Sequence, residues 1–207
     1  MHQFSEATRT WFAAAFAEPT PAQVGAWDTI AAGRHALVVA PTGSGKTLSA
    51  FLWSIDRLAN EPVPSNKRGR CRVLYVSPLK ALAVDVERNL RAPLVGIRHT
   101  ADRLGLEVPE IRVGVRSGDT SPADRRRIQT SPPDILITTP ESLFLMLTSQ
   151  ARESLRGVET VIIDEVTPSP APSAERTWSF RSSAWTSCST DRPSASASRR
   201  RCVPSTR

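Results

Sequence analysis

The sequence has no long apolar run and few residues of the kinds that bind metals or form disulfides. Its 207 residues include three cysteines and three histidines, with no Cys-x-x-Cys pair and no spacing typical of metal ligands. No stretch approaches the roughly 20 apolar residues of a membrane-spanning helix. Polar residues interrupt the first apolar stretch, 4–16, so it does not read as a secretory signal. We therefore expect a cytoplasmic protein without a zinc site or a disulfide framework.

The last 41 residues lack the side chains that build a hydrophobic core. Residues 167–207 contain eleven Ser, seven Arg and five Pro, with one Val and no Leu, Ile or Met. They also carry most of the formal net charge of +7, so basic charge is weak support for nucleic-acid binding by the remainder. Such a composition buries too little apolar area to offset the entropy of ordering it. We expect one domain over residues 1–166 and a disordered tail over 167–207.

Short apolar runs alternate with helical patterns through the first 166 residues. Runs rich in β-branched residues predict buried parallel strands, at 36–40, 72–77, 111–115, 134–138 and 159–163. Helical patterns cover 5–17, 21–32, 46–59, 81–105 with an interruption or kink near Pro93, 121–128 and 139–147. This alternation predicts an α/β domain with a parallel sheet and helices on both faces. In such a sheet, ligands bind beyond the carboxyl ends of the strands.

Residues 40–47, Ala-Pro-Thr-Gly-Ser-Gly-Lys-Thr, lie between a predicted strand and a predicted helix, as a phosphate-binding loop does. Its glycines would let backbone amides turn toward phosphate oxygens, and the helix N-terminus favours an anion. Lys46 is expected to reach the β and γ phosphates of ATP, and Thr47 to coordinate Mg²⁺. The residues expected to hold the nucleotide here are Thr42, Gly43, Ser44, Gly45, Lys46 and Thr47. The alternative is a glycine-rich turn with a solvated lysine.

Two adjacent carboxylates, Asp164 and Glu165, follow the last predicted strand. We expect Asp164 to hold Mg²⁺ through water and Glu165 to orient and deprotonate the attacking water, with Lys46 as the third catalytic residue. Acids at strand ends are also common on ordinary surfaces, so this assignment depends on the phosphate loop upstream. A water-activating acid favours hydrolysis over transfer by a P-loop kinase.

Gln23 closes the segment Pro19-Thr-Pro-Ala-Gln, seventeen residues before Ala40. A glutamine amide presents a donor and an acceptor together and can pair with the edge of adenine. We therefore expect Gln23 to contact the base of ATP. The alternative is a helix cap with an exposed glutamine.

Six segments resemble, in order, motifs of superfamily-2 helicases, and three of them resemble the Lhr (large helicase-related) family in particular. The segments are 19–23, 40–47, 77–82, 117–120, 138–143 and 164–166. The resemblance implies a RecA-like domain that couples ATP hydrolysis to movement on single-stranded DNA or RNA, and the family points to DNA repair. The residues that it implies for contact with the strand are Pro78, Leu79, Lys80, Gly118, Asp119, Thr139, Pro140 and Glu141. Helix caps and turns are the alternative roles for these positions.

The resemblance stops at Val166, because the family pattern continues with His where this sequence has Thr167. We interpret 167–207 as the product of a frameshift, which reading the gene in its other two frames would test. The second RecA-like domain and arginine finger of the family do not follow. Because such a finger contributes about 10³ to 10⁵ in rate in related enzymes, we expect weak or negligible turnover and no unwinding. A binding module without turnover and an unfolded product are the alternatives.

Overall fold

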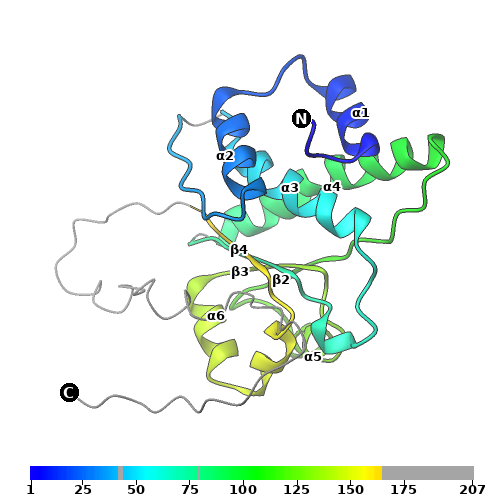
Figure 1. Cartoon of the computed structure of the whole chain (residues 1–207). Coiled ribbons are helices and arrows are strands. Elements are labelled where there is room, and N and C mark those ends of the chain that lie inside the picture. The colour runs from blue at the N-terminus through cyan, green and yellow to red at the C-terminus, as the bar shows by residue number, and fades with distance from the viewer. Residues whose placement is uncertain (42–43, 79, 165–207) are drawn as a thin grey trace, which may run out of the picture. The chain divides into compact units, whose positions relative to one another are not determined.

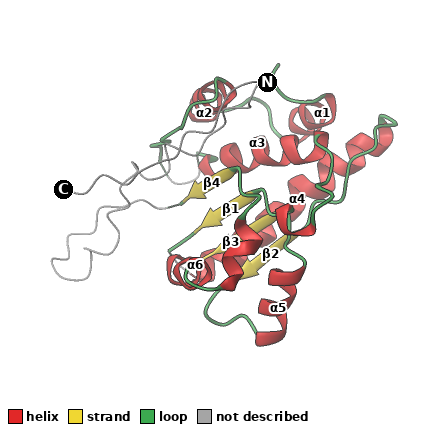
Figure 2. Cartoon of the chain, turned by 60° about the horizontal axis from the view of Figure 1, so that its bottom comes forward, coloured by secondary structure: helices red, strands yellow, loops and turns green. Residues whose placement is uncertain are grey.

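Four parallel strands form one sheet in the computed structural model, which describes residues 1–41, 44–78 and 80–164. The strands are β1 (Val73–Val76), β2 (Val113–Arg116), β3 (Ile135–Thr138) and β4 (Thr160–Ile163), and their order is β2-β3-β1-β4. Val76 pairs with both Thr138 and Ile163, and Arg116 pairs with Thr138. All four strands therefore end in one row, and their arrows point the same way in Figure 2. The predicted disordered tail, 167–207, lies outside the described residues.

Helices cover both faces of this sheet, as the sequence predicts (Figure 1). On one side are α1 (Glu6–Ala15), α2 (Pro21–Ala31), α3 (Lys46–Asn60) and α4 (Lys80–Arg103). On the other are α5 (Pro122–Thr130) and α6 (Pro140–Leu147), with the short 3-10 helix η2 (Gln150–Leu155); a second one, η1 (Lys67–Gly69), precedes β1. Four of the helices begin at a side chain that accepts a backbone N–H, which explains where they start. These caps are Ser5, Thr20, Ser121 and Thr139.

Helix α4 runs through Pro93 without a break, so of the two expectations there the interruption is wrong, while the kink stays a prediction. Proline removes one backbone donor, and this disfavours a helix locally. Here Leu90 before it and Ile97 after it are both buried in the same core, which holds the two halves in one helix. Although α4 is the longest helix, none in the described part of the chain is long and apolar enough to cross a membrane.

The two central strands, β1 and β3, are buried on both faces of the sheet. Successive residues of each strand point to opposite sides. Val73 and Tyr75 of β1 pack with residues of α1 to α4, whereas Leu74 and Val76 pack with α5, α6 and η2. The alternation repeats in β3 and explains why both strands are continuous apolar runs. Four of the five predicted strands are thus confirmed.

The fifth predicted strand, 36–40, is not formed. This segment is irregular, and Leu37 and Val39 are 84% and 86% exposed. A strand is stable only when its backbone groups pair with a neighbour, and 36–40 pairs with none of the described strands. Among these strands β4 lies at one edge, where Val161 and Ile163 are 49% and 60% exposed. Apolar composition alone did not reveal whether a partner was present.

Helix α3 runs antiparallel to the strands that it covers. At its C-terminal end Arg57 contacts Glu159 at 3.2 Å, and Glu61 accepts a hydrogen bond of 3.2 Å from Arg72. Glu159 and Arg72 directly precede β4 and β1, so they lie at the amino ends of these strands. The N-terminus of α3, at Lys46, is therefore directed toward the carboxyl ends.

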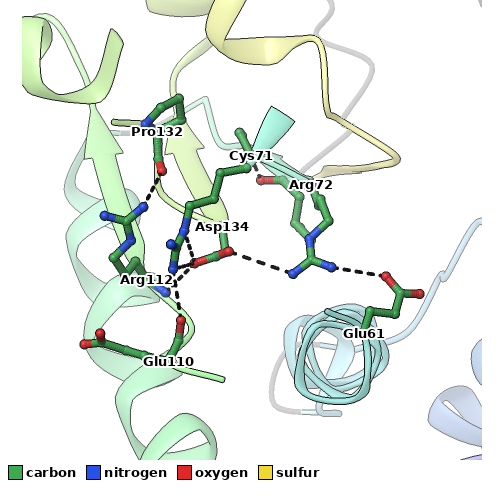
Figure 3. A network of polar contacts seen from close by, with 9 residues as sticks. Glu61, Cys71, Arg72, Glu110, Arg112, Pro132 and Asp134 are labelled. Atoms are coloured by element: carbon green, nitrogen blue, oxygen red, sulfur yellow. Dashed lines mark hydrogen bonds and ion pairs between the residues drawn. The ribbon is translucent and has the colours of Figure 1, made fainter. Parts of the chain in front are cut away.

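A buried acid joins the amino ends of three strands (Figure 3). Asp134, before β3, is 1% exposed and accepts from the Arg70 guanidinium at 3.1 Å and from the Arg112 backbone N–H at 2.8 Å. Arg72 lies 3.9 Å from the other carboxylate oxygen. Beside this cluster, burial raises the pKa of the Cys71 thiol to about 12. The edge of the sheet at the amino ends of the strands is thus occupied by structural contacts. We therefore expect ligands at the opposite edge, where the strands end, which we call the carboxyl rim.

Candidate nucleotide and nucleic-acid site

The carboxyl rim of the sheet gathers four of the sequence motifs. The residues that follow the strands are Ser117 after β2, Thr139 after β3, Ser77 after β1 and Asp164 after β4. Backbone bonds of 3.0 Å from Ser77 N to Thr138 O and from Asp164 N to Val76 O continue the pairing into this row. Since adjacent strands lie about 4.8 Å apart, the row extends over roughly 15 Å. The expectation that the motifs share one rim is met for these four strand ends.

The phosphate loop enters α3 through Gly45, whose φ of +76° strongly favours glycine. A Cβ atom at this position would overlap the Gln23 side-chain amide. Within the described part of the chain no side chain caps α3, and the N–H groups of its first turn have no acceptor inside the helix. The Ser44 hydroxyl is buried and has no hydrogen-bond partner in the described part of the chain. These donors fit a bound anion such as a phosphate group.

Lys46 is folded back over the loop that precedes it. Its ammonium group donates to the carbonyl oxygens of Ala40 and Pro41, the latter at 2.9 Å. The side chain thus already points along the loop in which phosphates are expected. Thr47 is exposed, and its coordination of Mg²⁺ stays a prediction. Thr42 and Gly43 lie outside the described residues.

Three side chains of α2 and its N-cap hydrogen-bond to the end of the predicted phosphate loop and to the start of α3. Thr20 Oγ1 donates to Ser44 O at 3.2 Å, Gln23 Nε2 donates to Gly45 O at 3.3 Å, and Trp27 Nε1 donates to Ser49 O at 2.8 Å. Sequence analysis assigned no role to Thr20 or Trp27. Their spacing at three and four residues from Gln23 places all three on one helix face, and this was the available clue.

Gln23 caps α2 and is buried. Its Oε1 accepts from Thr20 N at 2.9 Å in a capping box, and the residue is 4% exposed. The cap alternative is therefore present, although the glutamine is not exposed as that alternative assumed. A glutamine amide offers two N–H groups and two lone pairs, and these contacts use one of each. Contact with adenine stays a prediction.

Asp164 is held at the end of β4 by Tyr75 of β1, whose hydroxyl donates to its carboxylate. The Tyr75 ring also stacks against Phe51 of α3, with ring centroids 4.9 Å apart and an interplanar angle of 32°. This arrangement connects the helix of the phosphate loop with the expected metal-binding acid. Tyr75 was read from the sequence only as part of a strand. Glu165 lies outside the described residues.

The residues expected to contact nucleic acid differ in exposure. Thr139 is 2% exposed and its hydroxyl accepts from Ser142 N at 3.4 Å, so it serves as the cap of α6. Gly118 forms a turn whose carbonyl accepts from Arg125 at 2.6 Å. The other residues on this rim are exposed or partly exposed: Pro78, Asp119, Pro140 and Glu141. Leu79 and the side chain of Lys80 lie outside the described part.

The fold and this rim belong to a known class. The sequence profile of the DEAD/DEAH box helicase family matches residues 20–169, and the chain belongs to that family. Within it, the chain is similar to Lhr helicases. It is 66% identical over 164 residues to the Lhr helicase/probable uracil glycosylase of Mycolicibacterium smegmatis, and 57% identical over 167 residues to the Lhr helicase/uracil glycosylase of Escherichia coli. Each match covers 79% of this chain and 11% of the relative.

A solved structure of the M. smegmatis helicase Lhr, bound to single-stranded DNA and AMP-PNP, has the same fold. Its TM-score is 0.72 at 64% identity, and the match covers 78% of this chain and 20% of that one. The DEAD-box helicase Mss116 shares the fold alone, with a TM-score of 0.62 at 20% identity. The predicted RecA-like fold and the resemblance to Lhr are thus confirmed. The chain spans only about a tenth of the length of the two Lhr relatives and a fifth of the chain in the solved Lhr structure.

Proposed function

We propose that residues 1–166 form the ATP-binding domain of an Lhr-like helicase, which binds ATP with Mg²⁺ and single-stranded DNA at the carboxyl rim of its sheet. The observation that carries the proposal is the antiparallel course of α3. Its contacts with the amino ends of β1 and β4 direct Lys46 toward the rim that ends in Asp164. The similar M. smegmatis structure, with its DNA and AMP-PNP, supports both ligands.

ATP would be held by the loop 40–47. The N–H groups at the start of α3, which have no acceptor inside the helix, and the buried Ser44 hydroxyl would supply donors for phosphate oxygens. Lys46 would exchange its two backbone carbonyl partners for the β and γ phosphates. Gln23, with the remaining donor and acceptor of its amide, would meet the adenine edge.

Mg²⁺ would take few ligands from the protein itself. This ion keeps several waters and usually binds through one or two carboxylates together with substrate phosphates. The exposed Thr47 hydroxyl and the Asp164 carboxylate are the two protein groups that fit this donor set. When bound, the ion would neutralise charge on the phosphates, and Glu165 would orient the attacking water.

Single-stranded DNA would lie along the rest of the rim. The exposed Pro78, Asp119 and Glu141 follow three neighbouring strands, which gives a track across the sheet edge. The turn at Gly118 and the α6 N-terminus that Thr139 caps would offer backbone N–H groups to phosphates. Thr139 itself would act by shaping this helix end, because its hydroxyl is buried.

An ATP-binding assay with matched lysine variants tests the proposal. Fluorescent ATP should bind the chain in the presence of Mg²⁺, and Lys46→Ala should weaken binding at least tenfold. Lys67→Ala, in the exposed 3-10 helix η1, is the matched control and should bind as the parent chain does. Equal binding by all three proteins, or by none, would refute the assigned site.

Two further assays separate an enzyme from a binding module. ATP hydrolysis should be slow with and without single-stranded DNA, because the family's arginine finger is not among residues 1–166. Binding of labelled single-stranded DNA, measured by anisotropy, should weaken as salt rises. Strand separation that depends on ATP would contradict the expected weak turnover.

A further inference from the structure

We propose that Tyr75 is a positioning residue, which orients the Asp164 carboxylate toward the divalent cation that accompanies ATP. This inference rests on the proposed function and adds a residue that none of the helicase motifs in the sequence includes. Two contacts of Tyr75 support it: the hydroxyl hydrogen-bonds to Asp164 at the end of β4, and the ring packs on Phe51 of α3.

The position of Tyr75 follows from the strand register. Tyr75 pairs with Ile162 of β4, and Asp164 lies two residues further along. Because side chains at positions i and i+2 share a face, Asp164 is directed to the same face of the sheet as Ile162 and Tyr75. Ile162 packs in the core that contains α3, so this is the face over which the phosphate-loop helix lies. The Tyr75 hydroxyl reaches along this face from β1 to the end of β4, where it donates a hydrogen bond to the Asp164 carboxylate.

The ring of Tyr75 is fixed before any ligand arrives. The residue is 1% exposed, and its ring packs on Phe51, five residues after Lys46 in α3. A rigid donor restricts the rotation of the carboxylate that accepts its bond. One carboxylate oxygen, Oδ2, takes this bond, and an ionised carboxylate has about four acceptor positions on its two oxygens. Because Tyr75 holds Oδ2, the orientation of the whole carboxylate group depends on a buried ring.

Groups that hold a metal-binding side chain by hydrogen bonds commonly change metal affinity when they are removed, by about 10- to 100-fold. A purely structural role is the competing explanation, since a buried hydroxyl needs some partner. The two explanations differ in how loss of the Tyr75 hydroxyl affects the dependence of nucleotide binding on the cation. Both explanations allow Tyr75 to lie near the cation, but only a positioning role makes removal of its hydroxyl change the cation requirement.

Tyr75 is the single tyrosine of the sequence, which allows a direct test on the complete chain. Protein labelled with 3-fluorotyrosine gives one ¹⁹F resonance, and it reports on Tyr75. AMP-PNP with Mg²⁺ should shift this resonance more than AMP-PNP with EDTA, and Mn²⁺ in place of Mg²⁺ should broaden it. If nucleotide and metal bind but the resonance neither shifts nor broadens, the inference is overturned. If nucleotide does not bind, the proposed function fails and this inference fails with it.

A substitution tests the consequence. Tyr75→Phe keeps the ring and removes the hydroxyl, and it should raise the Mg²⁺ concentration for half-maximal AMP-PNP binding about tenfold. Thr138→Val is the control, because it removes another buried hydroxyl, which donates to Arg116 O at 2.8 Å at the same end of the sheet. Its Mg²⁺ requirement should match that of the parent chain. In an Asp164→Asn background, Tyr75→Phe should cause no further change.

Equal Mg²⁺ requirements in the parent and in Tyr75→Phe would contradict the positioning role. An equal shift in Thr138→Val would do so too, since it would show a general effect of destabilising the sheet. If the Tyr75→Phe protein does not fold, the fluorotyrosine spectra decide, because the labelled protein keeps the Tyr75 hydroxyl.

Discussion

Gln23 Nε2 donates a hydrogen bond of 3.3 Å to the carbonyl oxygen of Gly45, across 22 residues of sequence. The same glutamine accepts from Thr20 N at 2.9 Å and so also caps α2. The start of α2 and the end of the phosphate loop are therefore built as one unit. A substitution at either Gln23 or Gly45 should therefore alter nucleotide binding.

Gly45→Ala should lower both stability and ATP binding. The substituted Cβ would meet the Gln23 amide, and the residue would be held at positive φ. Gly33→Ala is the matched control, because Gly33 has a φ of +72° with nothing within 4 Å of the added Cβ. It should lose about 1–2 kcal/mol of unfolding free energy and keep full ATP binding. Chemical denaturation and fluorescent ATP binding measure the two effects, and equal ATP binding by both variants would contradict the coupling.

Asp134→Asn should destabilise the fold strongly. Asp134 is the acid shared by Arg70, Arg72 and the Arg112 N–H, so its neutralisation removes the charged partner of the largely buried Arg70, while Arg72 keeps Glu61. Removing one partner of a buried ion pair costs about 3–5 kcal/mol. Glu159→Gln removes an acid from the exposed pair with Arg57 and should cost less than about 1 kcal/mol. Similar midpoints of urea unfolding for the two variants would show that the Figure 3 cluster is not structural.

Cys71 should be unreactive in the folded protein. Burial raises its pKa from 9.0 to about 12, with a smaller contribution from Asp134, so the reactive thiolate is scarce at pH 8. A Cys188→Ser, Cys202→Ser double variant leaves Cys71 as the single thiol for a labelling assay with a disulfide reagent. Labelling should be slow in buffer and fast in guanidinium chloride. Fast labelling in buffer would mean that this end of the sheet opens readily.

The raised pKa of Cys71 also predicts how the free energy of unfolding depends on pH. Below pH 9 the Cys71 thiol stays protonated in both the folded and the unfolded chain. Between pH 9 and about 12 the unfolded chain releases the proton while the folded chain retains it, so the free energy of unfolding falls as pH rises. Cys71→Ala should reduce this fall. An identical pH dependence of the unfolding free energy in both proteins would contradict the shift.

Val161→Lys should reduce self-association of the chain. Val161 lies on β4, at one edge of the described sheet, and is 49% exposed. Exposed apolar edge strands promote pairing with other chains, and a lysine opposes it. Leu104→Lys, at a residue that is 41% exposed beyond the end of α4, is the control and should change little. Light scattering over a concentration series measures both, and equal behaviour would show that the edge is not responsible.

The motifs and most of the fold could be predicted because they depend on local patterns. The apolar runs of β1 and β3, the cap at Thr139, and the glycine at position 45 each have a short-range physical cause. The segment 36–40 has the same local pattern, yet it is irregular, because strand formation depends on a pairing partner that a local pattern does not reveal. The role of Tyr75 was hidden for a similar reason, since its partner Asp164 is 89 residues away.

The most direct test of the account is hydrogen exchange, followed by mass spectrometry, with and without AMP-PNP and Mg²⁺. The central claim is that the phosphate loop and the end of β4, far apart in sequence, meet around one nucleotide. Peptides covering 44–50 and 160–164 should gain protection together, and Lys46→Ala should abolish both gains. Protection of the first segment alone, or of neither, would contradict the claim.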